Sequence, residues 1–540
     1  MRLKLRYFAL VTGIFIVLLI VFAWWAFAPY RNLDLLIVNG LVVDGTGGDP
    51  RLCDIAVRDG KIVGMSSWRF FFSKPKTKID AGGRIVAPGF IDVHTHIEPN
   101  LPSASVFTPA NFLRQGVTTL ITGNCGRSRT NIEGMFKTLE KHGSAINLAT
   151  LVGHNSIRKE VMGDAPRTPT NDEFNRMLAL TEQAMKEGAI GLSTGLVYVP
   201  GRFAHRTEVI ALAKVVKQYE GIYASHIRDE AHDGVAAIKE AIDIGRKAGT
   251  PVEISHFKCS GPRQWNTMLS RLHLVEQAQA EGQQVNIDVY PYDRSSTTTD
   301  VLLPDWAVGD KRNGLREIAK TPALRQQLHN DIYVRLKQDG WQDLSHVRLA
   351  YSKPEWIGKT LAEAPKPAAT LDGQIENLIS ISLLGGAQAI YGDMKESDVE
   401  QVVAAPYGVF GSDSAVRDAE GVYKPHPRGC GTFPKIFRLY VREKAILTLS
   451  EAVRKASSEA ARIFGLEDRG ILKEGYWADI VIFDAATIED RADYEQPFAE
   501  PNGIDYVIVN GVITVDHGNL VDVKPAPGMP LRKKKPESPS

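Results

Sequence analysis

Short apolar runs alternate with longer amphipathic stretches through most of the chain. The apolar runs predict eight strands, at residues 89–94, 118–123, 147–152, 189–193, 222–225, 252–255, 285–290 and 408–412. Helical patterns follow many of them, for example at 170–187 and 232–248. Strands that alternate with helices in this way are typical of an α/β fold. We therefore expect a (β/α)8 barrel of the TIM type over residues 89–465.

One long segment, at about 294–365, separates the seventh strand from the eighth. It is rich in helix-forming residues and contains Trp306, Trp341 and Trp356. The composition predicts a helical subdomain inserted into the barrel. Such a subdomain either covers the site at the barrel mouth or is inert.

The four residues Ile-Val-Asn-Gly occur at 37–40 and again at 508–511, each time within an alternating apolar stretch. Asn-Gly between two such stretches is a strong signal for a β-hairpin turn. The repeat therefore predicts a hairpin near each end of the chain. Either the hairpins are unrelated, or they share one small β-sandwich domain built from residues 34–88 and 466–518.

The first residues have a different pattern. Arg2, Lys4 and Arg6 precede an almost unbroken apolar run of 21 residues, 8–28, which is about 31 Å long as a helix and long enough to cross a bilayer. We expect a transmembrane anchor, with its basic end in the cytoplasm and the rest of the chain outside. A cleaved signal peptide is the alternative. At the other end, Pro, Ser and basic residues predict a disordered tail over 524–540.

Composition argues against some classes of function but does not identify the activity. The chain has 540 residues, 64 Lys and Arg against 63 Asp and Glu, and only four cysteines. The balanced charge gives no indication of nucleic-acid binding, and four cysteines make no disulfide framework. The oligomeric state has no signature in the sequence.

Metal-binding side chains recur where the predicted strands end. His94 and His96 form a His-x-His pair, whose two side chains point the same way from a strand. The other candidates at strand ends are Cys125, His226, His256 and Asp413. In a barrel these strand ends meet at one face, and a thiolate with imidazoles suits zinc. A carboxylate beside zinc is suited to act as a general base, so we assign that role to Asp413; a role as a metal ligand or structural cap is the alternative.

These motifs resemble those of a known enzyme superfamily. His94-Thr-His96, Gly-Asn-Cys125-Gly, Ser-His226-Ile-Arg, Ser-His256-Phe-Lys and Gly-Ser-Asp413-Ser are similar to those of the amidohydrolase superfamily, and within it to the N-acyl-D-amino-acid deacylases, or D-aminoacylases. The Asn-Cys-Gly element is the specific one. The resemblance runs from about residue 35 to about 518 and implies the shared β domain at the two ends.

The resemblance also implies roles for single residues. Cys125, His226 and His256 would form one tight zinc site, while His94 and His96 would form a second, weaker position that Cys125 can bridge. The cysteine would replace a carboxylated lysine used by many relatives, and the fourth predicted strand here contains no lysine. Residues implied in holding the substrate are Lys258, Tyr290, Ser296 and Arg428.

The implied activity is zinc-dependent hydrolysis of the amide bond of N-acyl-D-amino acids, giving a D-amino acid and a carboxylate. A cyclic-amide hydrolase of the dihydroorotase or hydantoinase type is one alternative. An L-specific acylase or dipeptidase on the same metal site is another, because pocket shape decides stereochemistry. A membrane-tethered binding protein that has lost catalysis is a third. The expected partner is a small N-acyl amino acid.

Overall fold

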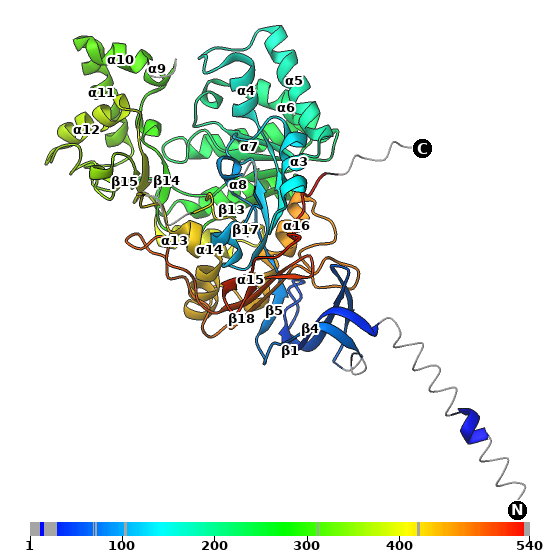
Figure 1. Cartoon of the computed structure of the whole chain (residues 1–540). Helices are drawn as coiled ribbons and strands as arrows, with labels where there is room; N and C mark the ends of the chain where they lie inside the picture. Colours follow the sequence, from blue (N-terminus) through cyan, green and yellow to red (C-terminus); the bar gives the residue numbers. More distant parts are fainter. Residues whose placement is uncertain are drawn as a thin grey trace, which may run out of the picture.

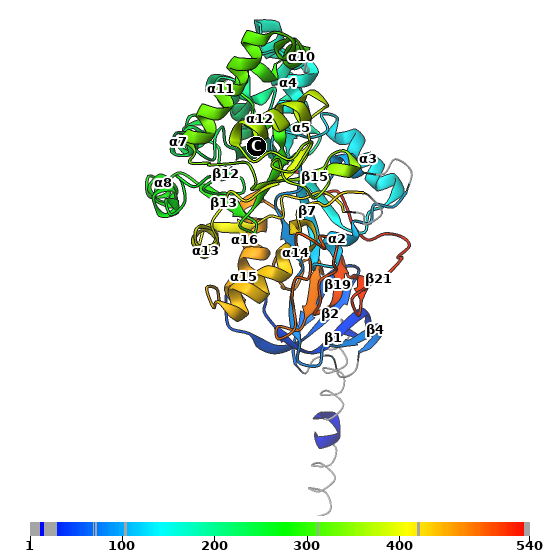
Figure 2. The same ribbon diagram turned by 90° about the vertical axis from the view of Figure 1, so that its left-hand side faces the viewer.

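The computed structural model describes residues 11–15, 30–67, 70, 73–101, 105–309, 313–417 and 422–533. Three parts are visible in Figure 1: a sheet at the bottom made from both ends of the chain, a barrel in the middle, and an inserted subdomain at the upper left. Figure 2 shows the same arrangement from the side, with the sheet below the barrel.

Strands from the two ends of the chain form one nine-stranded sheet, in the order β21-β20-β19-β18-β5-β1-β2-β3, with β4 paired to β1. The strands are β1 (Asn32–Val42), β2 (Arg51–Arg58), β3 (Lys61–Met65), β4 (Lys74–Asp80), β5 (Ile85–Pro88), β18 (Ile480–Phe483), β19 (Ile504–Val509), β20 (Val512–Asp516) and β21 (Asn519–Leu520). The two ends join where β5 and β18 pair antiparallel. Ile37, Ile55, Ile480 and Ile508 are fully buried in one cluster across this junction.

The two Ile-Val-Asn-Gly segments fold differently. Asn510 and Gly511, both with positive φ, turn the chain between β19 and β20, so the hairpin predicted there is present. At 39–40 the predicted hairpin is wrong, because β1 continues through Asn39 and Gly40 to Val42 with a register shift against β2. Asn39 has φ 57° and bonds to Asp54 and Asp80 on the neighbouring segments. The left-handed residue therefore makes a β-bulge here.

The barrel contains the eight predicted strands. They are β6 (Phe90–Asp92), β7 (Val117–Thr122), β8 (Asn147–Thr150) continued by β9 (Val152–Gly153), β10 (Gly191–Gly195), β11 (Ile222–His226), β12 (Val252–Ile254), β13 (Val285–Val289) and β17 (Gly408–Phe410). Neighbours pair in parallel, and the ring closes where the Val93 amide donates to the Phe410 carbonyl (3.4 Å). The (β/α)8 prediction is confirmed.

Helices surround the barrel (Figure 1). They are α2 (Ala110–Leu113), α3 (Ile132–His142), α4 (His154–Met162), α5 (Asn171–Lys186), α6 (Arg206–Lys217), α7 (Gly234–Ala248), α8 (Met268–Ala280), α13 (Glu396–Ala404), α14 (Arg428–Lys435), α15 (Leu449–Ala456) and α16 (Ser458–Phe464). Four of these helices, α3, α5, α6 and α15, begin at a residue whose side chain accepts a first-turn amide. Thr170 accepts the Glu173 amide and Glu173 accepts the Thr170 amide, which is a capping box at the start of α5.

The inserted subdomain extends beyond the predicted 294–365. It contains β14 (Ser295–Thr298), α9 (Asp305–Val308), α10 (Asn313–Lys320), α11 (Pro322–Gln338), β15 (Val347–Tyr351), α12 (Leu371–Leu383) and β16 (Gln388–Tyr391). The later residues belong to it because β16 pairs with both β14 and β15. Leu328, Ile375 and Ala389 share a separate apolar core.

The two ends of the chain depart from expectation in different ways. Residues 524–533 are not disordered, because Gly528 donates to the Ser144 carbonyl, Leu531 donates to the Leu148 carbonyl, and Arg532 pairs with Glu133. The tail prediction is therefore wrong for this segment, and 534–540 lie outside the described residues. The predicted membrane segment 8–28 is described only at 11–15. Among the described residues, no helix is both long and apolar enough to cross a membrane.

Candidate metal centre

Each candidate ligand lies at the end of a barrel strand or just past it. His94 and His96 follow β6, Cys125 follows β7, His226 ends β11, His256 follows β12, and Asp413 follows β17. Cys125, His256 and Asp413 have φ values of 51°, 37° and 49°, in the left-handed region. A left-handed residue shortly after a strand turns the backbone sharply, and here it keeps three side chains at the barrel mouth.

The glycines beside Cys125 explain the Gly-Asn-Cys-Gly motif. Gly123 and Gly126 both have positive φ, which side chains disfavour. A Cβ at Gly123 would lie 2.1 Å from the Leu151 carbonyl oxygen, and one at Gly126 would lie 2.1 Å from Asn155 Oδ1. Only glycine fits at both positions, and the tight turn brings the Cys125 thiol into the site.

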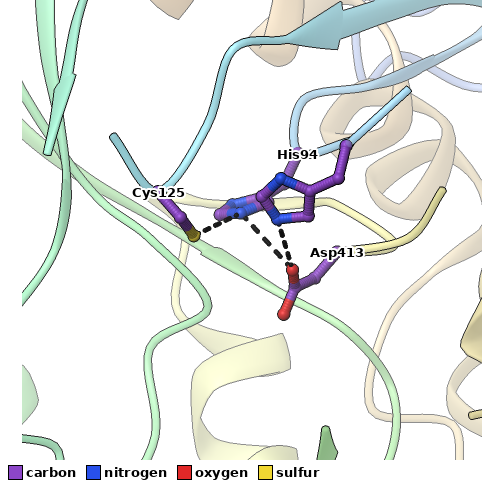
Figure 3. A group of neighbouring side chains, drawn as sticks. His94, Cys125 and Asp413 are labelled. Atoms are coloured by element: carbon purple, nitrogen blue, oxygen red, sulfur yellow. Dashed lines mark hydrogen bonds and ion pairs between the residues drawn. The ribbon is translucent and has the colours of Figure 1, made fainter. Parts of the chain in front are cut away.

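The thiol lies at the centre of the histidines. Cys125 Sγ is 3.3 Å from His94 Nε2, 3.5 Å from His226 Nδ1 and 3.6 Å from His256 Nε2. Asp413 Oδ1 is 3.0 Å from His96 Nε2 and 3.6 Å from His94 Nε2. Figure 3 shows Cys125, His94 and Asp413 pointing toward one another. The structure thus brings together all six of the residues proposed for metal binding and catalysis.

Two groups of donors with a common member emerge from these distances. Cys125, His226 and His256 form one, which we call the inner group. Cys125 joins His94, His96 and Asp413 in the other, which we call the outer group. In each group the donor atoms lie within 4.8 Å of one another. Both groups can hold a metal ion, with Cys125 placed to bridge them.

Charge keeps the acidic donors ionised. Burial raises the pKa of the Cys125 thiol, but the charges of His94 and His226 outweigh burial and hold that pKa well below its usual range. Burial also raises the pKa of Asp413, whereas the charges of Arg428 and His94 bring it well below its usual range. The site therefore presents a thiolate, the form that binds metals, beside a carboxylate.

Two carboxylates stand behind the histidines, Asp288 buried and Glu230 partly exposed. Glu230 Oε1 lies 2.9 Å from His256 Nδ1 and 2.6 Å from Lys258 Nζ. Asp288 Oδ2 lies 3.2 Å from His94 Nδ1, and its Oδ1 accepts the His256 amide. A carboxylate on one ring nitrogen fixes the tautomer and leaves the other nitrogen free for a metal.

Neither of these carboxylates was singled out in the sequence, although each had a signal. Asp288 is a charged residue in the middle of the apolar strand β13, where burial requires a partner. Glu230 comes four residues after His226 in a loop and carries no regular pattern. Conversely, His154 was not proposed as a ligand, and it pairs with Glu208 (2.8 Å) away from both groups.

The residues implied in substrate binding surround the same point. Arg428 Nη1 lies 2.9 Å from Asp413 Oδ2, and its guanidinium is 4.6 Å from the centre of the Tyr290 ring. Lys258 Nζ is 5.6 Å from that centre. Arg428 Nη2 donates to the Ser296 carbonyl (3.3 Å). Two cations thus converge on one tyrosine beside the donor groups.

Two cavities meet at Asp413. The outer cavity has a volume of about 920 Å³ and reaches His96, Cys125 and Arg428. The inner cavity is smaller, about 120 Å³, and reaches His226, His256, Lys258 and Tyr290. Residues that line both are Tyr198, Ser296, Thr297 and Asp413. A substrate whose reacting bond lies beside Asp413 would have one end in each cavity.

The sequence matches a known protein family and similar enzymes over most of its length. The family model described as "Amidohydrolase family" matches residues 77–515. The N-acyl-D-glutamate deacylase of Alcaligenes xylosoxydans xylosoxydans is 34% identical over 506 residues, which cover 89% of this chain and 93% of that protein.

Solved structures match over most of the chain as well. The N-acyl-D-glutamate deacylase of Bordetella bronchiseptica, solved with zinc and a phosphonate inhibitor that mimics the tetrahedral intermediate, is 32% identical with a TM-score of 0.77. A D-aminoacylase whose structure was used to study its binuclear metal centre, with activation by one metal and attenuation by the second, is 31% identical with a TM-score of 0.77. Each comparison covers 93% of this chain and 100% of the other.

Proposed function

The chain belongs to the amidohydrolase family, and on that premise we propose that it is a zinc-dependent deacylase that hydrolyses N-acyl-D-amino acids to a D-amino acid and a carboxylate. The observation that carries the proposal is the convergence of Cys125 with His226 and His256 beside Asp413. The relatives that are more than 30% identical over most of their length act on linear N-acyl amino acids by name, which favours this activity over hydrolysis of a cyclic amide.

The inner group fits zinc in chemistry and in spacing. Zinc bonds of about 2.3 Å to sulfur and about 2.0–2.1 Å to nitrogen, at tetrahedral angles, place the two donors about 3.5 Å apart. The distances from Cys125 Sγ to His226 and His256 are 3.5 and 3.6 Å. Three protein ligands leave a fourth position open, as in catalytic zinc sites. We assign the tight zinc to this group and a weaker second ion to the outer group.

Bound zinc would polarise the amide carbonyl and lower the pKa of a water molecule to about 7. Asp413 would take a proton from that water, because its carboxylate belongs to the outer group and lines the inner cavity together with His226 and His256. The same carboxylate would then deliver the proton to the departing amine nitrogen. Arg428, 2.9 Å from Asp413, orients it and keeps it ionised before the reaction.

We further infer that Lys258, Tyr290, Ser296 and Arg428 hold the carboxylate of the substrate. Charge-assisted hydrogen bonds from lysine and arginine are strong, and both cations lie near the Tyr290 ring. Lys258 and Tyr290 line the inner cavity, so anchoring the carboxylate against them would place the amino-acid part toward the inner cavity and the acyl part toward the outer cavity.

The direct test is a screen of the full-length, zinc-loaded protein against matched N-acetyl-D- and N-acetyl-L-amino acids. We expect release of D-amino acids at rates at least 100-fold above those of the L-forms. Preference for the L-forms would instead favour an L-specific acylase or dipeptidase. Turnover of hydantoin or dihydroorotate without turnover of linear substrates would favour the cyclic-amide alternative. A protein that binds zinc and hydrolyses none of these would be a binding protein.

We also propose that residues 8–28 anchor the enzyme in the cytoplasmic membrane, with the catalytic part on the periplasmic or external side. The support is the 21-residue apolar run preceded by Arg2, Lys4 and Arg6. The protein should fractionate with membranes and keep its N-terminus. A soluble product that begins near Pro29 would identify a signal peptide, and protection from protease in intact spheroplasts would place the catalytic part in the cytoplasm.

A further inference from the structure

The outer cavity is much larger than the usual small acyl groups require. Its volume of about 920 Å³ lies near the upper end of the range for sites that enclose drug-sized ligands. An acetyl group beside Asp413 would leave most of it empty. The space beyond the reacting bond therefore suits a longer acyl chain.

Positive charge is gathered on the wall of this cavity. Arg127, Lys159 and Arg417 line it, in addition to Arg428. Arg127 and Lys159 are exposed, and the guanidinium of Arg127 lies 5.0 Å from the centre of the Tyr198 ring. Arg417 Nε donates to Ser414 Oγ (3.1 Å). Within the part of the chain that the structure describes, no ion pair neutralises any of these three cations.

The acidic side chains on the same wall are already engaged. Asp413 pairs with Arg428. Glu98 accepts a hydrogen bond from Thr122 Oγ1 (2.5 Å) and another from the Gly123 amide. Neither carboxylate is within ion-pair distance of Arg127, Lys159 or Arg417. The described wall is therefore net positive, and a concave surface of one sign concentrates ligands of the opposite sign.

Helix α4 adds to the positive potential in the outer cavity. Its N-cap, Gly153, provides no side-chain cap, and first-turn residues Asn155 and Ser156 line the cavity. The Ser156 amide donates to the Gly126 carbonyl (3.0 Å), and the positive end of the helix dipole still favours negative charge there. Lys159 lies on the same helix, so the amide end and one of the cations act on the same space.

We propose that the outer cavity binds an acyl group that carries its own carboxylate, so that the preferred substrates are D-amino acids acylated by a dicarboxylic acid. This inference rests on the proposed function, because it assumes that the acyl part points into the outer cavity. The carboxylate at the far end of the chain lies among Arg127, Lys159 and Arg417. The carboxylate of the amino acid stays with Lys258 and Tyr290.

The test compares N-succinyl, N-butyryl and N-acetyl derivatives of one D-amino acid. Succinyl and butyryl have the same number of carbons and differ in the terminal carboxylate. We expect kcat/KM for the succinyl substrate to exceed that for the butyryl substrate about tenfold at low ionic strength, and the ratio to fall as salt is added. Succinate should also inhibit more strongly than butyrate, which measures binding without turnover.

Substitutions of the three cations test whether they cause the preference for the succinyl substrate. Arg127→Gln, Lys159→Gln and Arg417→Gln should each lower the succinyl-to-butyryl ratio about two- to fivefold, the range for a partly exposed charge pair. Lys186→Gln, which removes a lysine paired with Glu182 on the outside of α5, is the matched control and should leave the ratio unchanged. Zinc content and unfolding temperature establish that the variants are folded.

The possible outcomes distinguish failure of the acyl-group inference from failure of the proposed deacylase function. If no N-acyl-D-amino acid is hydrolysed, the proposed function fails. If acetyl and butyryl substrates are hydrolysed and the succinyl substrate is no better than butyryl at low salt, the acyl-group inference is overturned and the deacylase function stands. A succinyl-to-butyryl ratio that stays at the wild-type value in all three cation variants would equally overturn the assignment to these residues.

Discussion

The inner and outer donor groups share Cys125 but differ in what stands behind their other ligands. His256 is backed by Glu230 at 2.9 Å, and His226 Nε2 lies 3.9 Å from the same carboxylate. In the outer group, His94 is buried and backed by Asp288 at 3.2 Å, but His96 is 27% exposed and, among the described acidic side chains, pairs only with Asp413. Asp413 in turn pairs with Arg428.

This difference shows how one thiolate can serve two unequal metal positions. The inner ligands are buried and the His256 ring is held by Glu230, so little reorganisation is needed to bind an ion. In the outer group, an ion must compete with Arg428 for Asp413. We therefore expect the inner position to fill first, and Asp413 to be more valuable as a base than as a ligand.

The largest effect should come from removing the shared ligand. Cys125→Ala should lose most bound zinc, and activity should fall by more than the factor of about 10⁴ that can follow removal of a general acid–base. Metal analysis and kinetics measure the two together. Cys259→Ala and Cys430→Ala, which remove other buried thiols, should keep their zinc. Full zinc occupancy in Cys125→Ala would show that the groups do not depend on the thiolate.

Removing the base should separate metal binding from turnover. Asp413→Asn keeps the inner ligands intact, so it should retain one tight zinc while kcat falls about 10²- to 10⁴-fold. The comparison is zinc stoichiometry against kcat in the same preparation. Activity within a few-fold of wild type would refute the catalytic role of Asp413.

Weakening the support behind the inner group should reduce metal affinity. Glu230→Gln removes the charge that fixes His256, and zinc affinity should fall about 10- to 100-fold, measured by competition with a chelator. Glu182→Gln on the outside of α5 is a matched control. Unchanged affinity in Glu230→Gln would mean that burial alone orients the ring.

The smallest effect is expected at the outer group. His96→Asn should leave the first zinc equivalent bound with unchanged affinity and lower turnover by less than about tenfold, while abolishing the second equivalent seen at high zinc. Titration followed by metal analysis distinguishes the two equivalents. Loss of the first equivalent would reverse the assignment of tight and weak positions.

The parts of the fold that follow from short-range patterns were predictable. The eight barrel strands have apolar runs of the right length, and the ligands come at their ends, so both the barrel and the convergence of the six residues could be inferred. Glu230 could not be identified in this way. The role of this loop carboxylate depends on its contacts with His256 and Lys258, which come from another strand end.

Local signals failed where distant partners decide the structure. The same Ile-Val-Asn-Gly sequence is a turn at 508–511 and a bulge at 37–40, because β1 remains paired with β2 and β5 beyond Gly40. The basic, proline-containing segment 524–533 is ordered because Arg532 finds Glu133 and Glu140 on α3. Composition alone cannot identify the partners of either segment.

The nine-stranded sheet has a consequence for how the protein is made on the ribosome. Strand β5 needs β18 as its second neighbour, and Pro88 pairs with Ile480 at this junction. At synthesis rates of about 5–20 residues per second, the intervening chain takes roughly 20–80 s to emerge. During that interval the N-terminal strands present an unsatisfied edge, which is a site for wrong pairing with other chains. Completion of the sheet therefore waits until translation is almost finished.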